Sequence, residues 1–157
     1  MVGSSKPTDR ERSLAYAVGG LLAEAGVTVV CGGLGGVMEE CCRGAQDRGG
    51  LTFGILPGTT PAEGNPYLTV VLPSGIGELR NGLVVRASAA LIAIGSGYGT
   101  LSEIALARRT GLSCVLLESF EGILAEPPLA SPQGGSLYRA VDPEEAVRLA
   151  LEAGAAV

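Results

Sequence analysis

The chain has 157 residues and a mass of 15.8 kDa, a length that fits one domain with a sizeable hydrophobic core. Hydrophobic residues make up 46%, charged residues 17%, and the mean hydropathy is +0.37, which excludes a disordered chain. The net charge of −5 and the isoelectric point of about 4.7 argue against a nucleic-acid binder and leave room only for a local basic pocket.

Strand and helix signals alternate from the start. Residues 1–3 leave room for a stub of a first strand, so the sheet is short there or the strand begins upstream. Thr8-Asp9-Arg10-Glu11 has the order of a capping box and predicts a helix that ends near Gly26. The next predicted elements are a doubly buried strand at 27–31, a helix at 37–48, a strand at 51–56, a loop at 59–66 and a strand at 67–72.

The second half continues the alternation. The pattern predicts a helix at 76–87, a buried strand at 89–94, a helix that ends near Thr110 and a strand at 113–117, and the Pro-, Gly- and Ser-rich residues 121–136 are expected to cross the surface. Asp142-Pro143-Glu144-Glu145 predicts the start of a final helix of about ten residues. We therefore expect an α/β fold, a single-domain (1–157) Rossmann-like doubly wound parallel sheet with helices on both faces and ligands beyond the carboxyl ends of the strands.

Missing residue types narrow the chemistry. The chain has no histidine, which excludes His triads, His–metal sites and imidazole acid–base catalysis. Its one lysine, Lys6, lies in a polar N-terminal stretch away from the predicted core strands, so we expect neither a P-loop nor a pyridoxal-phosphate Schiff base.

The cysteines point to a reducing compartment. Cys31, Cys41, Cys42 and Cys114 lack a C-x-x-C spacing, so we expect buried reduced thiols and no protein-bound metal. No apolar run approaches the roughly 20 residues that span a bilayer, and the sequence shows no signal peptide. We expect a cytoplasmic protein without membrane contact.

Two glycine-rich loops each join a predicted buried strand to a helix. The second, Gly95-Ser96-Gly97-Tyr98-Gly99-Thr100, places bare backbone N–H groups at the positive end of a helix dipole and adds the Thr100 hydroxyl, which favours phosphate binding. Thr100 and Glu103 also have the spacing of a plain capping box, which needs no ligand. Capping does not explain the glycines, so we predict a phosphate site here.

The first loop contains Gly32, Gly33, Gly35 and Gly36, followed by Met38 on the next helix. It is a second candidate for ligand contact, and a tight turn between strand and helix is the alternative. Neither loop has the G-x-G-x-x-G spacing, so we expect no NAD.

Arg80 and Asn81 precede the strand that leads into the second loop. Arg80 could neutralise an anion there, and Asn81 could hydrogen-bond a base, ribose or pterin edge. An ordinary solvated surface arginine is the alternative for Arg80.

Five motifs in order carry a resemblance to a known superfamily. They are Gly32-Gly33-Leu34-Gly35-Gly36-Val37-Met38-Glu39, Gly49-Gly50, Gly54-Ile55-Leu56-Pro57-Gly58, Arg80-Asn81 and Gly97-Tyr98-Gly99-Thr100-Leu101-Ser102-Glu103. Together they resemble the "lysine decarboxylase-like" Rossmann superfamily, which includes the LONELY GUY cytokinin-activating phosphoribohydrolases and the molybdenum cofactor carrier proteins. The decarboxylase activity itself is excluded, because no lysine is placed for a Schiff base.

The resemblance implies two readings of the site. In the phosphoribohydrolases, which cleave the N-glycosidic bond of nucleoside 5′-monophosphates, an arginine followed by lysine and a glutamate are catalytic. Arg80 and Glu103 fall on these positions, but Asn81 replaces the lysine and Gly95-Ser96 replace a Pro-Gly pair. The hydrolase reading would need a partner carboxylate, for which Glu39 or Glu78 are the candidates.

The Arg-Asn pair, the second loop and Asn65-Pro66-Tyr67 are more similar to the carrier branch. That resemblance implies a small phosphorylated ligand, molybdopterin, bound without turnover and bringing its own metal. It also implies a homodimer or higher homo-oligomer. A nucleotide-sensing scaffold is a third hypothesis, less favoured because Arg80 and Glu103 are both present.

Overall fold

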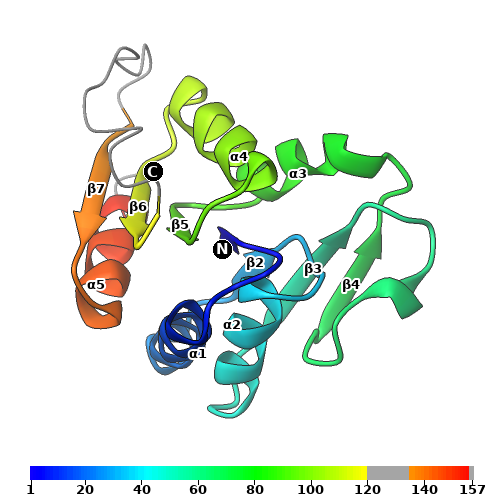
Figure 1. The fold of residues 1–157 in the computed structure, drawn as a ribbon, viewed down its shortest axis with the longest axis horizontal. Coiled ribbons are helices and arrows are strands. Elements are labelled where there is room, and N and C mark those ends of the chain that lie inside the picture. Colours follow the sequence, from blue (N-terminus) through cyan, green and yellow to red (C-terminus); the bar gives the residue numbers. More distant parts are fainter. Residues whose placement is uncertain (120–134, 156–157) are drawn as a thin grey trace.

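The computed structural model describes residues 1–119 and 135–155, and within them strands and helices alternate as the sequence predicts (Figure 1). The strands are β1 (Val2–Gly3), β2 (Val29–Cys31), β3 (Thr52–Leu56), β4 (Val70–Pro73), β5 (Leu91–Ile94), β6 (Cys114–Leu117) and β7 (Leu137–Ala140). The helices are α1 (Asp9–Glu24), α2 (Val37–Gln46), α3 (Asn81–Arg86), α4 (Tyr98–Arg109) and α5 (Pro143–Gly154), with short 3-10 helices η1 (Pro61–Glu63) and η2 (Gly77–Arg80).

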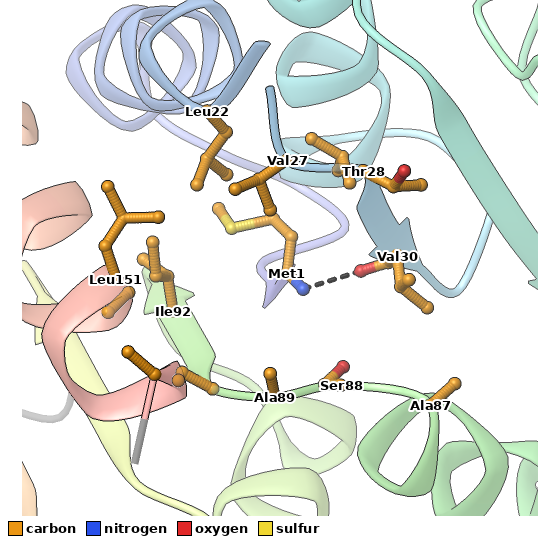
Figure 2. A pocket seen from close by; sticks show the side chains of 15 residues that line it. Met1, Leu22, Val27, Thr28, Val30, Ala87, Ser88, Ala89, Ile92 and Leu151 are labelled. Carbon is orange, nitrogen blue, oxygen red and sulfur yellow. Dashed lines mark hydrogen bonds between the residues drawn. The ribbon is translucent and has the colours of Figure 1, made fainter. Parts of the chain in front are cut away.

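All strand pairs are parallel. One sheet has the order β1-β5-β6-β7 and the other the order β2-β3-β4. The two sheets meet at β1, where the amino group of Met1 donates a hydrogen bond of 2.6 Å to the carbonyl of Val30 (Figure 2). Strands β2 to β4 thus extend to one side of β1 and strands β5 to β7 to the other, which makes the carboxyl end of β1 the topological switch point.

Helices cover both faces, as expected for the Rossmann-like class. Figure 1 shows α1, α2 and α5 on one face and α3 and α4 on the other. Alternate residues of β5 divide between them: Ile92 and Ile94 belong to the core under α1, α2 and α5, while Leu91 and Ala93 belong to the core under α3 and α4. This two-sided burial explains why the central strands have nearly continuous apolar sequences.

Helices α1 and α2 touch through their backbones because each offers a glycine to the other. A Cβ atom at Gly19 would lie 1.9 Å from the carbonyl oxygen of Cys41, and one at Gly44 would lie 2.0 Å from that of Tyr16. This close crossing fixes α2 and therefore the loop that precedes it. The predicted starts of α1 and α5 are confirmed as well: Thr8 and Glu11 form a reciprocal capping box, and the Asp142 carboxylate caps α5 by accepting from the Glu145 N–H.

Several local predictions were inaccurate. The helix predicted at 76–87 is η2 followed by α3, and the helix after the second loop begins at Tyr98 rather than at Thr100. Strand β7 was not predicted, because it is an edge strand whose half-exposed residues give a weak apolar signal. Most of the predicted surface crossing at 121–136 lies outside the described residues.

Candidate functional site

A cavity of about 820 Å³ lies at the carboxyl edge of the sheets, at the switch point. Its walls come from segments that are far apart in the sequence. They are the end of β1 and the residues after it, Leu34 of the first glycine loop, the start of α2, the residue after β3, the η2–α3 turn, and the second glycine loop with the first turns of α4.

The structure places most of the predicted site residues on this cavity. The predicted residues that line it are Met38, Arg80, Asn81, Ser96, Gly97, Tyr98, Gly99, Thr100 and Glu103. The four glycines of the first loop, Gly32, Gly33, Gly35 and Gly36, are not among the lining residues. Of the two candidate partner carboxylates, Glu78 lines the cavity and Glu39 does not.

Sequence reasoning missed Ser4, Ser5, Pro57 and Leu79, which also line the cavity. Ser4 and Ser5 follow β1, and the rule that ligands bind beyond the carboxyl ends of parallel strands could have identified them. Lys6 lies three residues after β1, closer to a core strand than the sequence predicts. Its side chain is not among those that line the cavity.

The first glycine loop is held by the rest of the protein. Gly33 and Gly36 have φ angles of +73° and +74°, a left-handed conformation that favours glycine. The Asn65 amide donates to the carbonyls of Gly33 and Leu34 at 3.2 and 3.1 Å. The tight-turn alternative therefore accounts for these glycines without a ligand.

The second loop is open. Residues 96–99 are exposed, and among the described residues no side chain caps the start of α4 at Gly97. The capping-box alternative is wrong here, because Thr100 is already the third residue of α4 and the Glu103 side chain turns toward Arg80. The uncapped first turn leaves the backbone N–H groups of α4 directed at the cavity, which is the arrangement that binds anions.

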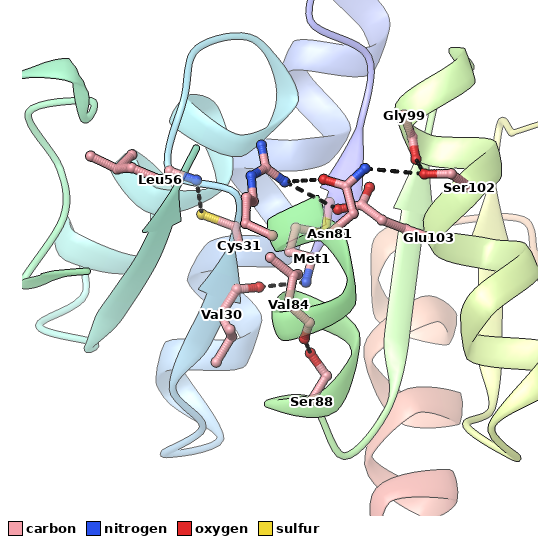
Figure 3. A network of polar contacts seen from close by, with 12 residues as sticks. Met1, Val30, Cys31, Leu56, Asn81, Val84, Ser88, Gly99, Ser102 and Glu103 are labelled. Carbon is pink, nitrogen blue, oxygen red and sulfur yellow. Dashed lines mark hydrogen bonds and ion pairs between the residues drawn. The ribbon is translucent and has the colours of Figure 1, made fainter. Parts of the chain in front are cut away.

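Arg80 lies on the cavity floor and is only 7% exposed, so the alternative of a solvated surface arginine is excluded. Its Nη1 atom donates to Asn81 Oδ1 at 2.6 Å and to Glu103 Oε1 at 3.4 Å, while its buried Nε has no hydrogen-bond partner in the described part of the chain. Asn81 in turn donates to Ser102 Oγ at 3.0 Å, and Ser102 donates to the Gly99 carbonyl (Figure 3). The network thus links the guanidinium to the second loop and leaves one strong donor unused.

Glu103 has a perturbed acidity. Burial in the cavity wall raises its pKa from 4.5 to about 7, and the positive charge of Arg80 only partly opposes this shift. The 3.4 Å contact between the two side chains is too long for a strong ion pair, which is consistent with the small opposing effect. Near neutral pH, Glu103 can therefore hold or release a proton.

Two buried thiols lie beneath the first loop. Cys31 Sγ is 3.6 Å from Cys42 Sγ and accepts from the Gly33 N–H at 3.3 Å. The contact with Cys42 lowers the pKa of Cys31 and raises that of Cys42, so Cys31 ionises first. All four cysteines are buried and free, as predicted.

Residues 1–119 and 135–155 contain no cluster of three or more His, Cys, Asp or Glu side chains placed to hold a metal ion. None of their helices is both long and apolar enough to cross a membrane.

The fold and the cavity define a Rossmann-like α/β protein with a polar site at its topological switch point. Residues 1–147 match the SLOG cluster4 family, and the chain belongs to this family. An uncharacterised protein of Archaeoglobus fulgidus is 40% identical over 111 residues, which are 71% of this chain and 73% of that protein.

Two solved structures are similar over almost the whole chain. The molybdenum cofactor binding protein of the phototrophic bacterium Rippkaea orientalis has a TM-score of 0.87 and 32% identity, with 96% of this chain and 93% of that chain covered. The molybdenum cofactor carrier protein of Chlamydomonas reinhardtii has a TM-score of 0.83 and 29% identity, with 98% and 96% covered. The superfamily and the carrier branch that the motifs resemble are thereby confirmed.

Proposed function

We propose that this protein binds a small phosphorylated ligand in the switch-point cavity, and that the ligand is the molybdopterin of molybdenum cofactor, carried without turnover. The observation that carries the proposal is the buried, unpartnered Nε of Arg80 beside the uncapped start of α4. A buried donor without a partner destabilises the protein unless a ligand or water accepts from it. The likeness to cofactor-binding and carrier proteins supports the choice of ligand.

The groups in the cavity suit such a ligand. The N–H groups at residues 97–100 and the Thr100 hydroxyl would bind the terminal phosphate, and Arg80 would neutralise it. Thr100 is buried, yet its hydroxyl makes no hydrogen bond within the described residues, so it is available to the ligand. Molybdenum would arrive on the dithiolene of the pterin as cargo, so the protein need not supply metal ligands.

A charge-removing variant tests this proposal. Arg80→Gln should weaken molybdopterin binding about tenfold to hundredfold, because a hydrogen bond to a charged group contributes about 1.5–3 kcal/mol. Arg86→Gln is the matched control, since Arg86 is exposed on α3 and does not line the cavity. Anaerobic titration of pterin fluorescence gives the dissociation constants. If wild-type protein fails to bind molybdopterin, or both variants bind alike, the proposal is wrong.

A second candidate function is hydrolysis of nucleoside 5′-monophosphates, and the raised pKa of Glu103 favours it. A carboxyl group with a pKa of about 7 can protonate the departing base as the glycosidic C–N bond breaks. Water then adds to the anomeric carbon of the oxocarbenium-like sugar and releases a proton to solvent. A guanidinium group does not serve as a general acid, so Arg80 would position the phosphate.

The test is incubation with AMP and chromatography of released adenine. Release that disappears in Glu103→Gln would establish the hydrolase and displace the carrier proposal. No release, together with molybdopterin binding that depends on Arg80, would leave a binding protein.

We also propose a homo-oligomer, as the resemblance implies, in a reducing compartment such as the cytoplasm. Edge strand β4 exposes Val70 by 54% and Leu72 by 44%, an apolar edge that a second copy could cover. The four buried free thiols support the proposal of a reducing compartment. Light scattering should give at least twice 15.8 kDa, and Leu72→Arg should shift the mass toward the monomer. A monomeric wild-type mass would refute the oligomer.

A further inference from the structure

The walls of the switch-point cavity divide into a polar floor and an apolar rim. On the floor, Arg80, Thr100 and Glu103 are 7%, 3% and 5% exposed. On the rim, Leu79 is 80% exposed and Tyr98 is 94% exposed, although both line the same cavity. Single exposed apolar side chains are common on protein surfaces, but these two share one cavity with the polar floor.

Neither rim side chain is explained by folding. Leu79 immediately precedes Arg80 in η2, and Tyr98 is the first residue of α4. Neither packs against one of the two hydrophobic cores, and the Tyr98 hydroxyl makes no hydrogen bond within the described residues. Tyr98 therefore does not stabilise the second loop. Its position between Gly97 and Gly99, which leave the loop uncrowded, gives the ring free access to whatever enters the cavity.

We propose that Tyr98 and Leu79 clamp the flat heteroaromatic ring of the ligand, and that they give the site its selectivity for pterin or purine phosphates over phosphates without a ring. This inference rests on the proposed function, because it assumes a phosphate on the polar floor. A ligand anchored there extends toward the rim, where a tyrosine face and a leucine side chain offer apolar contact to a planar ring. Stacking of this kind depends on ring area and not on charge.

The experiment compares ligands with and without a ring. Molybdopterin, AMP, ribose 5-phosphate and inorganic phosphate are titrated into wild type and Tyr98→Ala, Tyr98→Phe and Leu79→Ala. Val141→Ala is the matched control, because Val141 is also 80% exposed and does not line the cavity. We expect Tyr98→Ala to weaken molybdopterin and AMP binding roughly tenfold while ribose 5-phosphate and phosphate bind as before. Tyr98→Phe should restore the affinity, and wild type but not Tyr98→Ala should quench pterin fluorescence.

The outcomes separate this inference from the proposed function. If no phosphate-bearing compound binds to wild type, the proposed function fails. If they bind but Tyr98→Ala weakens all of them equally, or none of them, the phosphate site stands and the clamp is wrong. A loss of oligomer mass in Tyr98→Ala, with unchanged affinity for ring-bearing ligands, would assign the rim to a subunit contact and also overturn the clamp.

Discussion

The two glycine-rich loops have similar sequences and similar places in the fold, yet Gly33 and Gly36 of the first differ in their surroundings from Gly97 and Gly99 of the second. Gly95, where the second loop begins, is instead like the first loop, with a φ of +71° and a Cβ position 2.5 Å from Glu11. In the first loop, a Cβ at Gly33 would lie 2.6 Å from Leu56 and one at Gly36 would lie 2.4 Å from the Ser4 carbonyl oxygen. In the second, a Cβ at Gly99 would meet nothing within 4 Å, and one at Gly97 would meet only Thr100 Oγ1, at 4.0 Å.

This difference separates two reasons for glycine. The first loop needs glycine because the backbone is left-handed and the protein itself fills the space around it. The second loop has no such requirement at Gly97 and Gly99, so the empty space beside them is what a ligand would use. The first loop therefore positions the site, and the second is proposed to bind.

The largest effect is expected from Gly36→Ala. The left-handed φ of +74° and the backbone contact with Ser4 should together lower the free energy of unfolding by about 2–5 kcal/mol. Gly99→Ala is the matched control: its stability should be unchanged or raised by up to about 1 kcal/mol, because alanine suits a helix. Chemical denaturation measures both. Equal losses in the two variants would contradict the contrast between the loops.

The second prediction concerns pH. Burial raises the pKa of Glu103 from 4.5 to about 7, so the folded chain keeps a proton that the unfolded chain releases. The stabilisation is fully present below pH 4.5 and is lost as pH rises through about 7, a change of about 3 kcal/mol in the free energy of unfolding.

Glu103→Gln removes this titration and isolates it from all other groups. Between pH 5 and pH 8, the denaturant midpoint should fall more in wild type than in Glu103→Gln. The variant should be the more stable of the two proteins at pH 8. Parallel pH profiles for the two proteins would show that Glu103 has an ordinary pKa.

A smaller loss of stability is expected from Asn65→Ala. The variant removes the donors to the Gly33 and Leu34 carbonyls and the acceptor of the Tyr67 N–H, which should lower the free energy of unfolding by about 1–2 kcal/mol. Phosphate affinity should stay within about twofold, since Asn65 does not line the cavity. A large loss of affinity at unchanged melting temperature would place the first loop in direct contact with the ligand.

The smallest effect on stability is expected from Thr100→Val, which should change the free energy of unfolding by less than about 0.5 kcal/mol and weaken phosphate binding about fivefold. Thr52→Val is expected to have the opposite pattern of effects on stability and affinity. The Thr52 hydroxyl donates to the Tyr67 carbonyl at 2.6 Å, so this variant should lose about 1 kcal/mol of stability and keep its affinity. Calorimetry of unfolding and of phosphate binding on both variants distinguishes them, and the reverse pattern would exchange the roles of the two hydroxyls.

Local patterns in the sequence determined the fold. Continuous apolar runs marked the strands that are buried on both faces, and Thr8 and Asp142 marked the starts of α1 and α5, because periodicity and capping depend on neighbours a few residues apart. The same local signals predicted a helix start at Thr100 that the structure places at Tyr98, and the Glu103 side chain contacts Arg80 instead of completing a capping box.

Only the tertiary structure decided which loop is open and which residues share the cavity. Parallel pairing of β1 with β5 brings Ser4 and Ser5 beside the second loop, more than 90 positions further along the chain. Packing of α3 against α4 brings Arg80, just before α3, beside Glu103, and the burial of Glu103, which no local pattern encodes, raises its pKa. The sequence thus determined most of the elements and named Arg80 and Glu103 as candidates, while the raised pKa of Glu103, the unused Nε donor of Arg80 and the apolar rim above them depend on contacts between distant segments.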